Sequence, residues 1–112
     1  MNRDSVDCVR VDGPPHGDDW VGAEALKKPG EFFWLRSRED VVTDLLIFLP
    51  GDEGGSVAPV PVILGHGALS PTRWGWNGDL EKPTLTPSIW RNQNVGRNEW
   101  HGHLTNGRLV SC

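Results

Sequence analysis

The sequence is poor in several features that usually indicate where a protein works. It has no tyrosine, one methionine and two cysteines among its 112 residues. Two thiols are too few for a disulfide framework, so we expect both cysteines to be free in a reducing compartment. The longest apolar run, residues 45–49, is far too short to cross a bilayer, and residues 1–13 lack the apolar core of a signal peptide. We therefore expect a cytoplasmic protein without a membrane partner.

Positive charge and known catalytic motifs are also scarce. The formal net charge is −4 at pH 7, and the basic residues form no run or stripe, which argues against nucleic acid as a partner. The chain has no Gly-x-Ser-x-Gly nucleophile motif, no phosphate-binding loop and no dinucleotide-binding fingerprint. These absences favour a protein that acts by binding, and they leave the question of an enzyme open.

Glycine, proline and tryptophan are abundant, with 14, 9 and 6 residues. The glycines and prolines predict many turns and few long helices, while the tryptophans supply large side chains for the core of a small domain. A chain of this length is one domain. We expect residues 1–30 to form an irregular arm, with at most one helical turn at 23–28, and residues 31–112 to form a single compact β domain.

From residue 31 onward the pattern is that of short strands separated by turns. The run 45–49 is continuously apolar, which indicates a strand covered on both faces. Pro59 and Pro61 have no N–H for a ladder, so the strand that contains them should begin at a sheet edge. The predicted fold is a small all-β sandwich or open barrel. About six strands are expected, at 31–38, 41–50, 57–65, 73–79, 81–90 and in a final hairpin.

The final segment, residues 100–112, carries the strongest local signal in the chain. Asn106-Gly107 fits the type I′ turn of a two-residue β-hairpin, in which both residues have positive φ. Such a turn fixes the register of the two strands, so His101 should lie opposite Cys112. Strand alternation then places Trp100, Leu104 and Leu109 on the core face. The opposite face should carry His101, His103, Thr105, Arg108, Val110 and Cys112.

This outward face of the hairpin gathers candidate metal ligands. Imidazole and thiolate bind zinc, which takes four ligands in structural sites. His101, His103 and Cys112 supply at most three of them, and His66 is the remote candidate for the fourth. The alternatives are a pocket in which His101, His103 and Arg108 bind an anion, or a plain surface without a cofactor. The geometry also allows Cys112 to act as a nucleophile with His101 as its base.

Residues near the hairpin are candidates for contact with a protein partner. The polar segment 91–99 is expected to be the most mobile loop. Four of the six tryptophans are spaced as core residues, namely Trp74, Trp76, Trp90 and Trp100. The alternative is that these four rings form an aromatic platform that binds a ligand. If the loop and the outward face of the hairpin form a binding surface, we expect it to include Arg108, Trp90, Arg97 and Trp100.

Three motifs resemble those of a known family. They are LLIFLPGDEGG (45–55), WGWNGDLEKPTLTPSIW (74–90) and WHGHLTNGRLVSC (100–112). Together they are similar to a family of small phage and bacterial proteins of unknown function, some labelled "ammonia monooxygenase". Many members look like zinc binders with a Cys-Pro-x-Cys-like knuckle. Here Leu49 and Asp52 occupy the knuckle positions, so the resemblance leaves Asp52 as an oxygen ligand beside His101 and Cys112.

The sequence thus leads to three functional hypotheses. The first is a non-enzymatic, phage-type accessory protein that binds a protein partner in the host cytoplasm. The second is a small zinc metalloprotein, structural or hydrolytic. The third is a virion component such as a decoration protein, which would form homo-oligomers.

Overall fold

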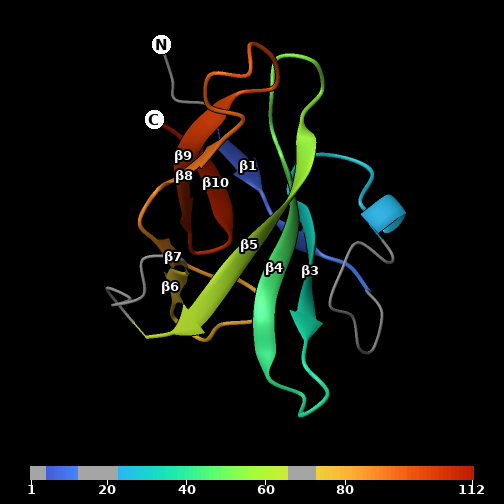
Figure 1. Ribbon diagram of the computed structural model, residues 1–112, viewed down its shortest axis with the longest axis vertical. Coiled ribbons are helices and arrows are strands. Elements are labelled where there is room, and N and C mark those ends of the chain that lie inside the picture. The colour runs from blue at the N-terminus through green and yellow to red at the C-terminus, as the bar shows by residue number, and fades with distance from the viewer. Residues whose placement is uncertain (1–4, 13–22, 66–72) are drawn as a thin grey trace.

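The computed structural model describes residues 5–12, 23–65 and 73–112, and within them it contains ten β-strands and one turn of 3-10 helix (Figure 1). The expected all-β class is confirmed, with more and shorter strands than the six predicted. No helix in these ranges is long and apolar enough to cross a membrane. The elements are β1 (Ser5–Asp7), β2 (Val9–Arg10), η1 (Ala23–Ala25), β3 (Glu31–Arg36), β4 (Val42–Leu49), β5 (Ser56–Leu64), β6 (Trp74–Trp76), β7 (Leu85–Thr86), β8 (Ile89–Arg91), β9 (Trp100–Thr105) and β10 (Arg108–Ser111).

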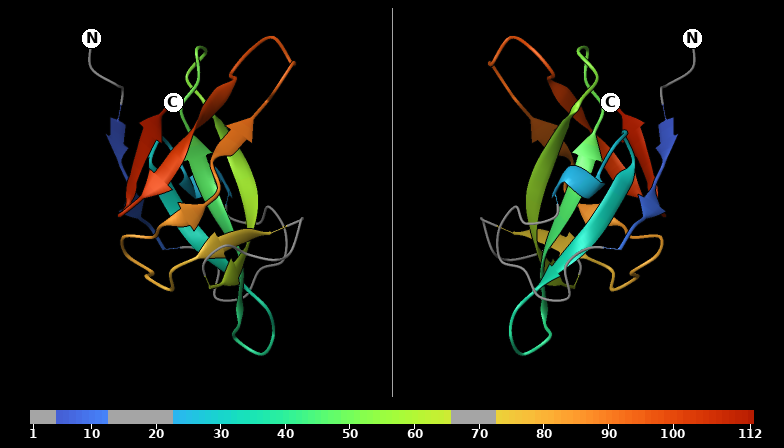
Figure 2. Two further views of the ribbon diagram at one scale, coloured as in Figure 1. Left: turned by 90° about the vertical axis from the view of Figure 1, so that its left-hand side faces the viewer. Right: turned by 90° about the vertical axis from the view of Figure 1, so that its right-hand side faces the viewer.

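The strands form two sheets that pack face to face as a small sandwich. One sheet has the order β1-β10-β9-β8, and the other has the order β2-β3-β4-β5-β6-β7. Seen from the side of the four-stranded sheet, β8, β9 and β10 lie in front of the longer strands β4 and β5 (Figure 2, left). The structure therefore agrees with the predicted sandwich and not with a closed barrel.

The main core fills the space between the two sheets. Its aromatic centre is Trp34 from β3, whose ring lies 4.7 Å from that of Trp76 in β6. Burying such large rings supplies much of the apolar area that a chain of this length can remove from water. The buried members are Phe32, Trp34, Leu45, Ile47, Leu49, Ala58, Val60, Val62, Trp76, Leu85, Ile89, Trp100, Leu104 and Leu109.

A second apolar cluster covers the other face of the six-stranded sheet. Phe33 and Leu35 of β3 and Leu46 of β4 pack there with Leu26, which follows η1. Both faces of β3 and β4 are therefore covered over residues 32–35 and 45–49, which explains why these two runs are continuously apolar instead of alternating. The prediction made from the run 45–49 is confirmed.

The prolines of β5 lie at the edge of a sheet, as the sequence predicts. Pro59 and Pro61 pair with β4 on one edge, and the parallel pairing with β6 begins only at Val62. The first part of β5 therefore has a ladder on one side only, as expected for residues that have no N–H to donate.

The N-terminal segment is more regular than the irregular arm expected for residues 1–30. β1 pairs with β10, and β2 pairs in parallel with β3, so the chain crosses from one sheet to the other between them. Cys8 lies at this crossing, and its backbone N–H donates to the carbonyl of Gly107 at 2.8 Å. A pattern of two- and three-residue strands is too short to be detected from periodicity alone.

The C-terminal hairpin has the predicted register. Thr105 pairs with Arg108, Leu104 with Leu109, His103 with Val110 and Gly102 with Ser111. Asn106 and Gly107 have φ values of 49° and 72°, as a type I′ turn requires. Trp100, Leu104 and Leu109 are buried, and His103 and Thr105 are exposed, which confirms the predicted faces.

A second crossing between the sheets lies between β7 and β8. β7 pairs with β6 at the end of the six-stranded sheet, and β8 pairs with β9 at the end of the four-stranded sheet. The single strand expected at 81–90 is therefore two short edge strands in different sheets. Ser88 lies in the link between them, directly before β8.

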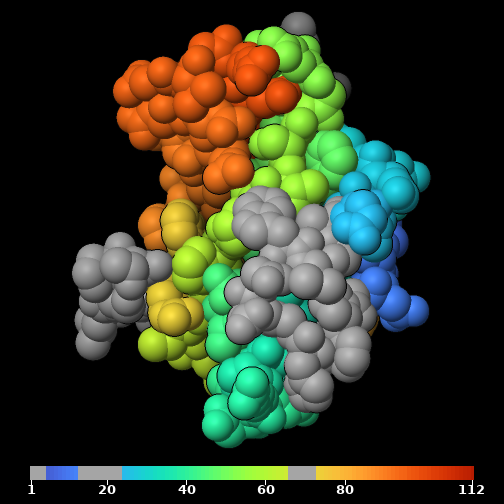
Figure 3. All heavy atoms as spheres, turned by 45° about the vertical axis from the view of Figure 1, so that its right-hand side comes forward, coloured from blue at the N-terminus to red at the C-terminus, as the bar shows by residue number. Residues whose placement is uncertain are grey.

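Loops extend the sandwich at both of its ends. In the space-filling view, the orange atoms that follow β8 form one end and the teal atoms of the β3–β4 turn form the other (Figure 3). The orange loop lies against the green loop between β4 and β5. Asn98 joins the two loops, because its side-chain oxygen accepts N–H bonds from Glu53 and Gly55 at 2.9 and 3.1 Å.

Gly102 is predicted to be required for packing in β9. A β-carbon at this position would clash with the indole of Trp100 and with the backbone oxygen of Val110. We expect Gly102→Ala to lower the free energy of unfolding by about 1–3 kcal/mol, as overpacked cores do. Thr105→Ala, on the exposed face of the same strand, should change it by less than about 0.5 kcal/mol. Urea denaturation measures both values, and equal stability of the two variants would contradict the packing role.

Candidate functional site

A serine and a histidine meet on the outward face of the four-stranded sheet. The Oγ of Ser88 lies 2.9 Å from the Nε2 of His101, within hydrogen-bond distance. Both residues are half-buried, so the pair is partly shielded from water and still open on one side. A hydroxyl bonded to an imidazole nitrogen is the arrangement of a nucleophile and its general base.

Hydrogen bonds to the backbone carbonyls of Ser88 and His101 fix the positions of both residues. The indole N–H of Trp74 donates to the carbonyl oxygen of Ser88 at 3.1 Å, which holds the link between β7 and β8 against β6. The carbonyl of His101 accepts the N–H of Cys112 at 2.9 Å, which continues the hairpin ladder by one residue. The two side chains therefore start from backbone positions that belong to the packed sandwich.

The third side chain of the site is Trp90. It is the cross-strand partner of His101, and the two rings are stacked with centroids 4.6 Å apart and an interplanar angle of 14°. The indole N–H of Trp90 donates to the Oε2 of Glu99 at 2.6 Å. Trp90 is 48% exposed, so it does not join Trp34, Trp76 and Trp100 in the core.

No acidic side chain of the described residues forms an ion pair with the His101 ring. In the serine–histidine–aspartate arrangement, a carboxylate holds the imidazole in the right orientation and stabilises its protonated form. Here the His101 ring bonds the hydroxyl of Ser88 and stacks on the indole of Trp90. The pair is therefore a serine–histidine dyad with an aromatic neighbour.

The candidate ligands predicted on the hairpin are only partly brought together. Cys112 is next to His101 through the backbone, and His103 is exposed on the same face. The imidazole of His101, however, contacts Ser88. Arg108, the candidate anion-binding residue, is paired with Asp7 at 3.0 Å.

Asp52 lies in a different environment from the hairpin histidines. Its Oδ1 accepts the backbone N–H of Asn98 at 2.6 Å, so it stabilises the contact between two loops. The described residues contain no group of three or more side chains that could hold a metal ion. His66 lies outside the described residues, and zinc binding through it stays a prediction.

The candidate contact residues also separate into different environments. Trp90 and Arg97 are exposed. Trp100 is 6% exposed and lies in the core, where its N–H donates to the Oγ of Ser111, which corrects its expected place on a binding surface. The segment 91–99, expected to be the most mobile loop, is joined to the neighbouring loop by Asp52 and Asn98.

Ser88 is a candidate functional residue that the sequence did not indicate. It lies in a Thr-Pro-Ser-Ile stretch that has none of the flanking glycines of a nucleophile motif. Only the pairing of β8 with β9 brings it to His101. In the structure the His101 imidazole bonds the hydroxyl of Ser88, whereas Cys112 bonds His101 through the backbone.

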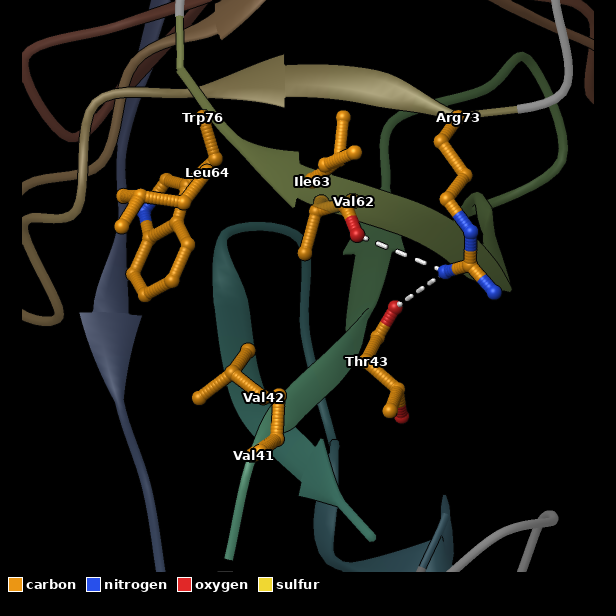
Figure 4. Close-up of a pocket in the computed structure, with 8 residues that line it drawn as sticks. All are labelled: Val41, Val42, Thr43, Val62, Ile63, Leu64, Arg73 and Trp76. Atoms are coloured by element: carbon orange, nitrogen blue, oxygen red, sulfur yellow. Dashed lines mark hydrogen bonds between the residues drawn. The ribbon is translucent and has the colours of Figure 1, made fainter. Parts of the chain in front are cut away.

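A separate apolar pocket of about 540 Å³ lies where β4 begins and β5 ends. The close-up shows valine, isoleucine and leucine side chains around it, with Arg73 at its rim (Figure 4). One guanidinium nitrogen of Arg73 donates to the carbonyls of Thr43 and Val62 at 3.2 and 3.4 Å. Neither Ser88 nor His101 lines this pocket, so it is not part of the dyad site.

The two cysteines are expected to react very differently. Burial raises the pKa of the Cys8 thiol to about 12, the nearby charge of Asp7 adds to this, and a backbone hydrogen bond with Leu109 opposes it. At pH 8 roughly one Cys8 thiol in ten thousand is then a thiolate, the form that attacks alkylating reagents. Cys112 is exposed.

We expect iodoacetamide to modify Cys112 and to spare Cys8 in the folded protein at pH 8. Peptide mass spectrometry measures the extent of labelling at each residue. Both cysteines should be modified in 6 M guanidinium chloride, which serves as the control. Equal labelling rates in the folded protein would contradict the described environment of Cys8.

The comparison with protein families gives one match. A family model described as "Bacterial ubiquitination-like system serine protease (BubE)" matches residues 24–112, which is most of the chain. Among curated proteins and among solved structures, no significant match to the chain was found. The matched segment includes both Ser88 and His101.

This match corrects two interpretations of the sequence. The family that the chain matches is not the phage-associated family labelled "ammonia monooxygenase". The family description also names a serine protease, which overturns the non-enzymatic, phage-type accessory role and the virion component, while zinc binding stays a prediction. The sequence has no familiar nucleophile motif, and a catalytic serine is defined by its neighbours in space and not by its flanking residues.

Proposed function

The chain belongs to the BubE family of bacterial ubiquitination-like system serine proteases, and we propose that it hydrolyses amide bonds with Ser88 as nucleophile and His101 as general base. The observation that carries this proposal is the 2.9 Å contact between the Ser88 Oγ and the His101 Nε2. It supplies the two groups that a serine protease needs in direct contact. Membership of a ubiquitination-like system indicates protein partners.

In the proposed acylation step, the Ser88 Oγ attacks the carbonyl carbon of the scissile amide while the Nε2 of His101 takes the hydroxyl proton. A tetrahedral intermediate forms, with the negative charge on the former carbonyl oxygen. When it collapses, the C–N bond breaks and His101 gives its proton to the leaving amine. The products of this half-reaction are a free amine and an ester between the substrate acyl group and Ser88.

In deacylation, a water molecule takes the place of the leaving amine. His101 removes a proton from this water, the oxygen attacks the ester carbonyl, and the C–O bond to Ser88 breaks as the proton returns to the serine oxygen. The enzyme is regenerated and the substrate leaves as a carboxylic acid. The same imidazole nitrogen therefore serves both half-reactions.

The location of the dyad suits a large substrate. Ser88 and His101 lie on the outward face of a sheet, at its edge strand β8, and the exposed indole of Trp90 stands beside them. An open site of this kind admits a folded protein with an extended terminus, whereas a closed cavity admits small molecules. We propose that the substrates are proteins joined by an amide bond to the carboxyl end of the ubiquitin-like modifier of this system.

The proposed nucleophile can be tested without knowing the substrate. A fluorophosphonate probe should label the protein once, at Ser88, because serine oxygen displaces fluoride from phosphorus only when a base accepts its proton. Peptide mass spectrometry identifies the labelled residue, and gel fluorescence measures the rate. Ser88→Ala should abolish labelling, and His101→Ala should reduce its rate at least about 100-fold.

Two variants on the same face serve as matched controls for this experiment. His103→Ala removes an exposed imidazole and Thr105→Ala removes an exposed hydroxyl, and neither residue contacts the dyad through a hydrogen bond in the structure. Both should label at the rate of the unmodified protein. Undiminished labelling of Ser88→Ala would overturn the proposed function, provided that its melting temperature is unchanged.

A further inference from the structure

We propose that Trp90, held in place by Glu99, is a positioning residue that orients the His101 ring where other serine proteases use a carboxylate. The inference rests on the proposed function, because it assigns a role within the same dyad. Its starting point is the stack of the two rings, at 4.6 Å and 14°, beside the Ser88–His101 hydrogen bond.

An imidazole on a strand needs a contact that fixes its rotation. The χ2 torsion of histidine is broad, so a free ring samples orientations in which Nε2 points away from Ser88. The flat indole of Trp90 restricts the rotation of the His101 ring, because a nearly parallel stack is lost when the imidazole turns about χ2. Trp90 therefore does by packing what a hydrogen-bonded carboxylate does by directional bonding.

The indole is itself held from its far side. Glu99 accepts the N–H of Trp90 at 2.6 Å, and Glu99 lies two residues before His101 on the same chain segment. Trp90 is also the direct cross-strand partner of His101 in the β8–β9 ladder. A half-exposed tryptophan would otherwise occupy several rotamers, so these two constraints explain why its ring stays over the imidazole.

The stack also favours the charge that His101 acquires during the reaction. The imidazolium formed on proton transfer is a cation that faces the π-system of Trp90, and such contacts are attractive. A negatively charged acceptor on the indole N–H increases the electron density of the ring, so Glu99 strengthens this attraction from a distance. Other polar side chains on this face are Ser88, which gives the proton, and the exposed His103, Thr105, Arg108 and Cys112.

The role of Trp90 can be measured with the same fluorophosphonate probe. Labelling rates over a range of probe concentrations give the maximal rate, kinact, and the half-saturating concentration, KI. We expect Trp90→Ala to lower kinact about 10- to 100-fold with KI changed less than about twofold, because a misplaced base affects the chemical step. Trp90→Phe keeps a stacking ring and should restore kinact to within about threefold of the unmodified protein. Glu99→Gln should fall between the two.

NMR gives an independent measurement of the orientation of the His101 ring. The ring protons of His101 should resonate upfield of those of His103, because only His101 lies against an indole face, and this difference should disappear in Trp90→Ala and persist in Trp90→Phe. Val95→Ala, which removes another exposed apolar side chain from the same loop region, is the matched control and should change neither measurement.

The outcomes separate this inference from the proposed function. Labelling of Ser88→Ala at the normal rate would defeat the proposed function itself. If Ser88→Ala is inert and Trp90→Ala keeps its full kinact, the dyad stands and the positioning role is wrong. Failure of Trp90→Phe to rescue kinact while it preserves the His101 shift would equally overturn the role of stacking.

Discussion

The two-residue turn at Asn106-Gly107 is the constraint on which the site depends. Because its residues adopt positive φ, the strands on either side pair without a bulge, and every side chain of β9 is assigned to one face. Trp100 and Leu104 then enter the core, and His101 between them must point outward. A shift of one residue would bury the imidazole and expose the tryptophan, so the apolar core and the proposed base are specified by the same register.

The edge strand β8 brings Ser88 next to the His101 of the hairpin. It continues the four-stranded sheet beyond β9, and the chain reaches it from the other sheet through the link that carries Ser88. The hydroxyl thus lies at the junction of the two sheets, where Trp74 holds its backbone from β6. Stability and chemistry are coupled here, because the contacts that close the end of the sandwich also set the distance between Ser88 and His101.

Three neighbouring segments of the chain supply the residues of the proposed active site. In the proposed mechanism the nucleophile comes from the link between β7 and β8, the base comes from the C-terminal hairpin, and the ring that orients the base comes from β8 between them. The family match supplies the reaction class. None of the described carboxylates forms an ion pair with the imidazole of His101. In the proposal, the imidazole is held instead by its stack on Trp90, whose indole N–H bonds Glu99. The zinc site expected from the hairpin residues includes the same His101, whose Nε2 faces the hydroxyl of Ser88, and zinc binding stays a prediction.

Local sequence specifies the fold class, the burial of β4 on both faces and the register of the final hairpin, because each follows from periodicity or from the backbone preferences of two turn residues. The partner of β9 on its other edge has no such local signal. β8 and β9 are separated by the loop 92–99, which is too long to impose a register, and their pairing is decided by the burial of Ile89 against the common core. For this reason His101 was recognised as a candidate residue from the sequence, whereas Ser88 as its partner and Trp90 as its support emerged only from the folded chain.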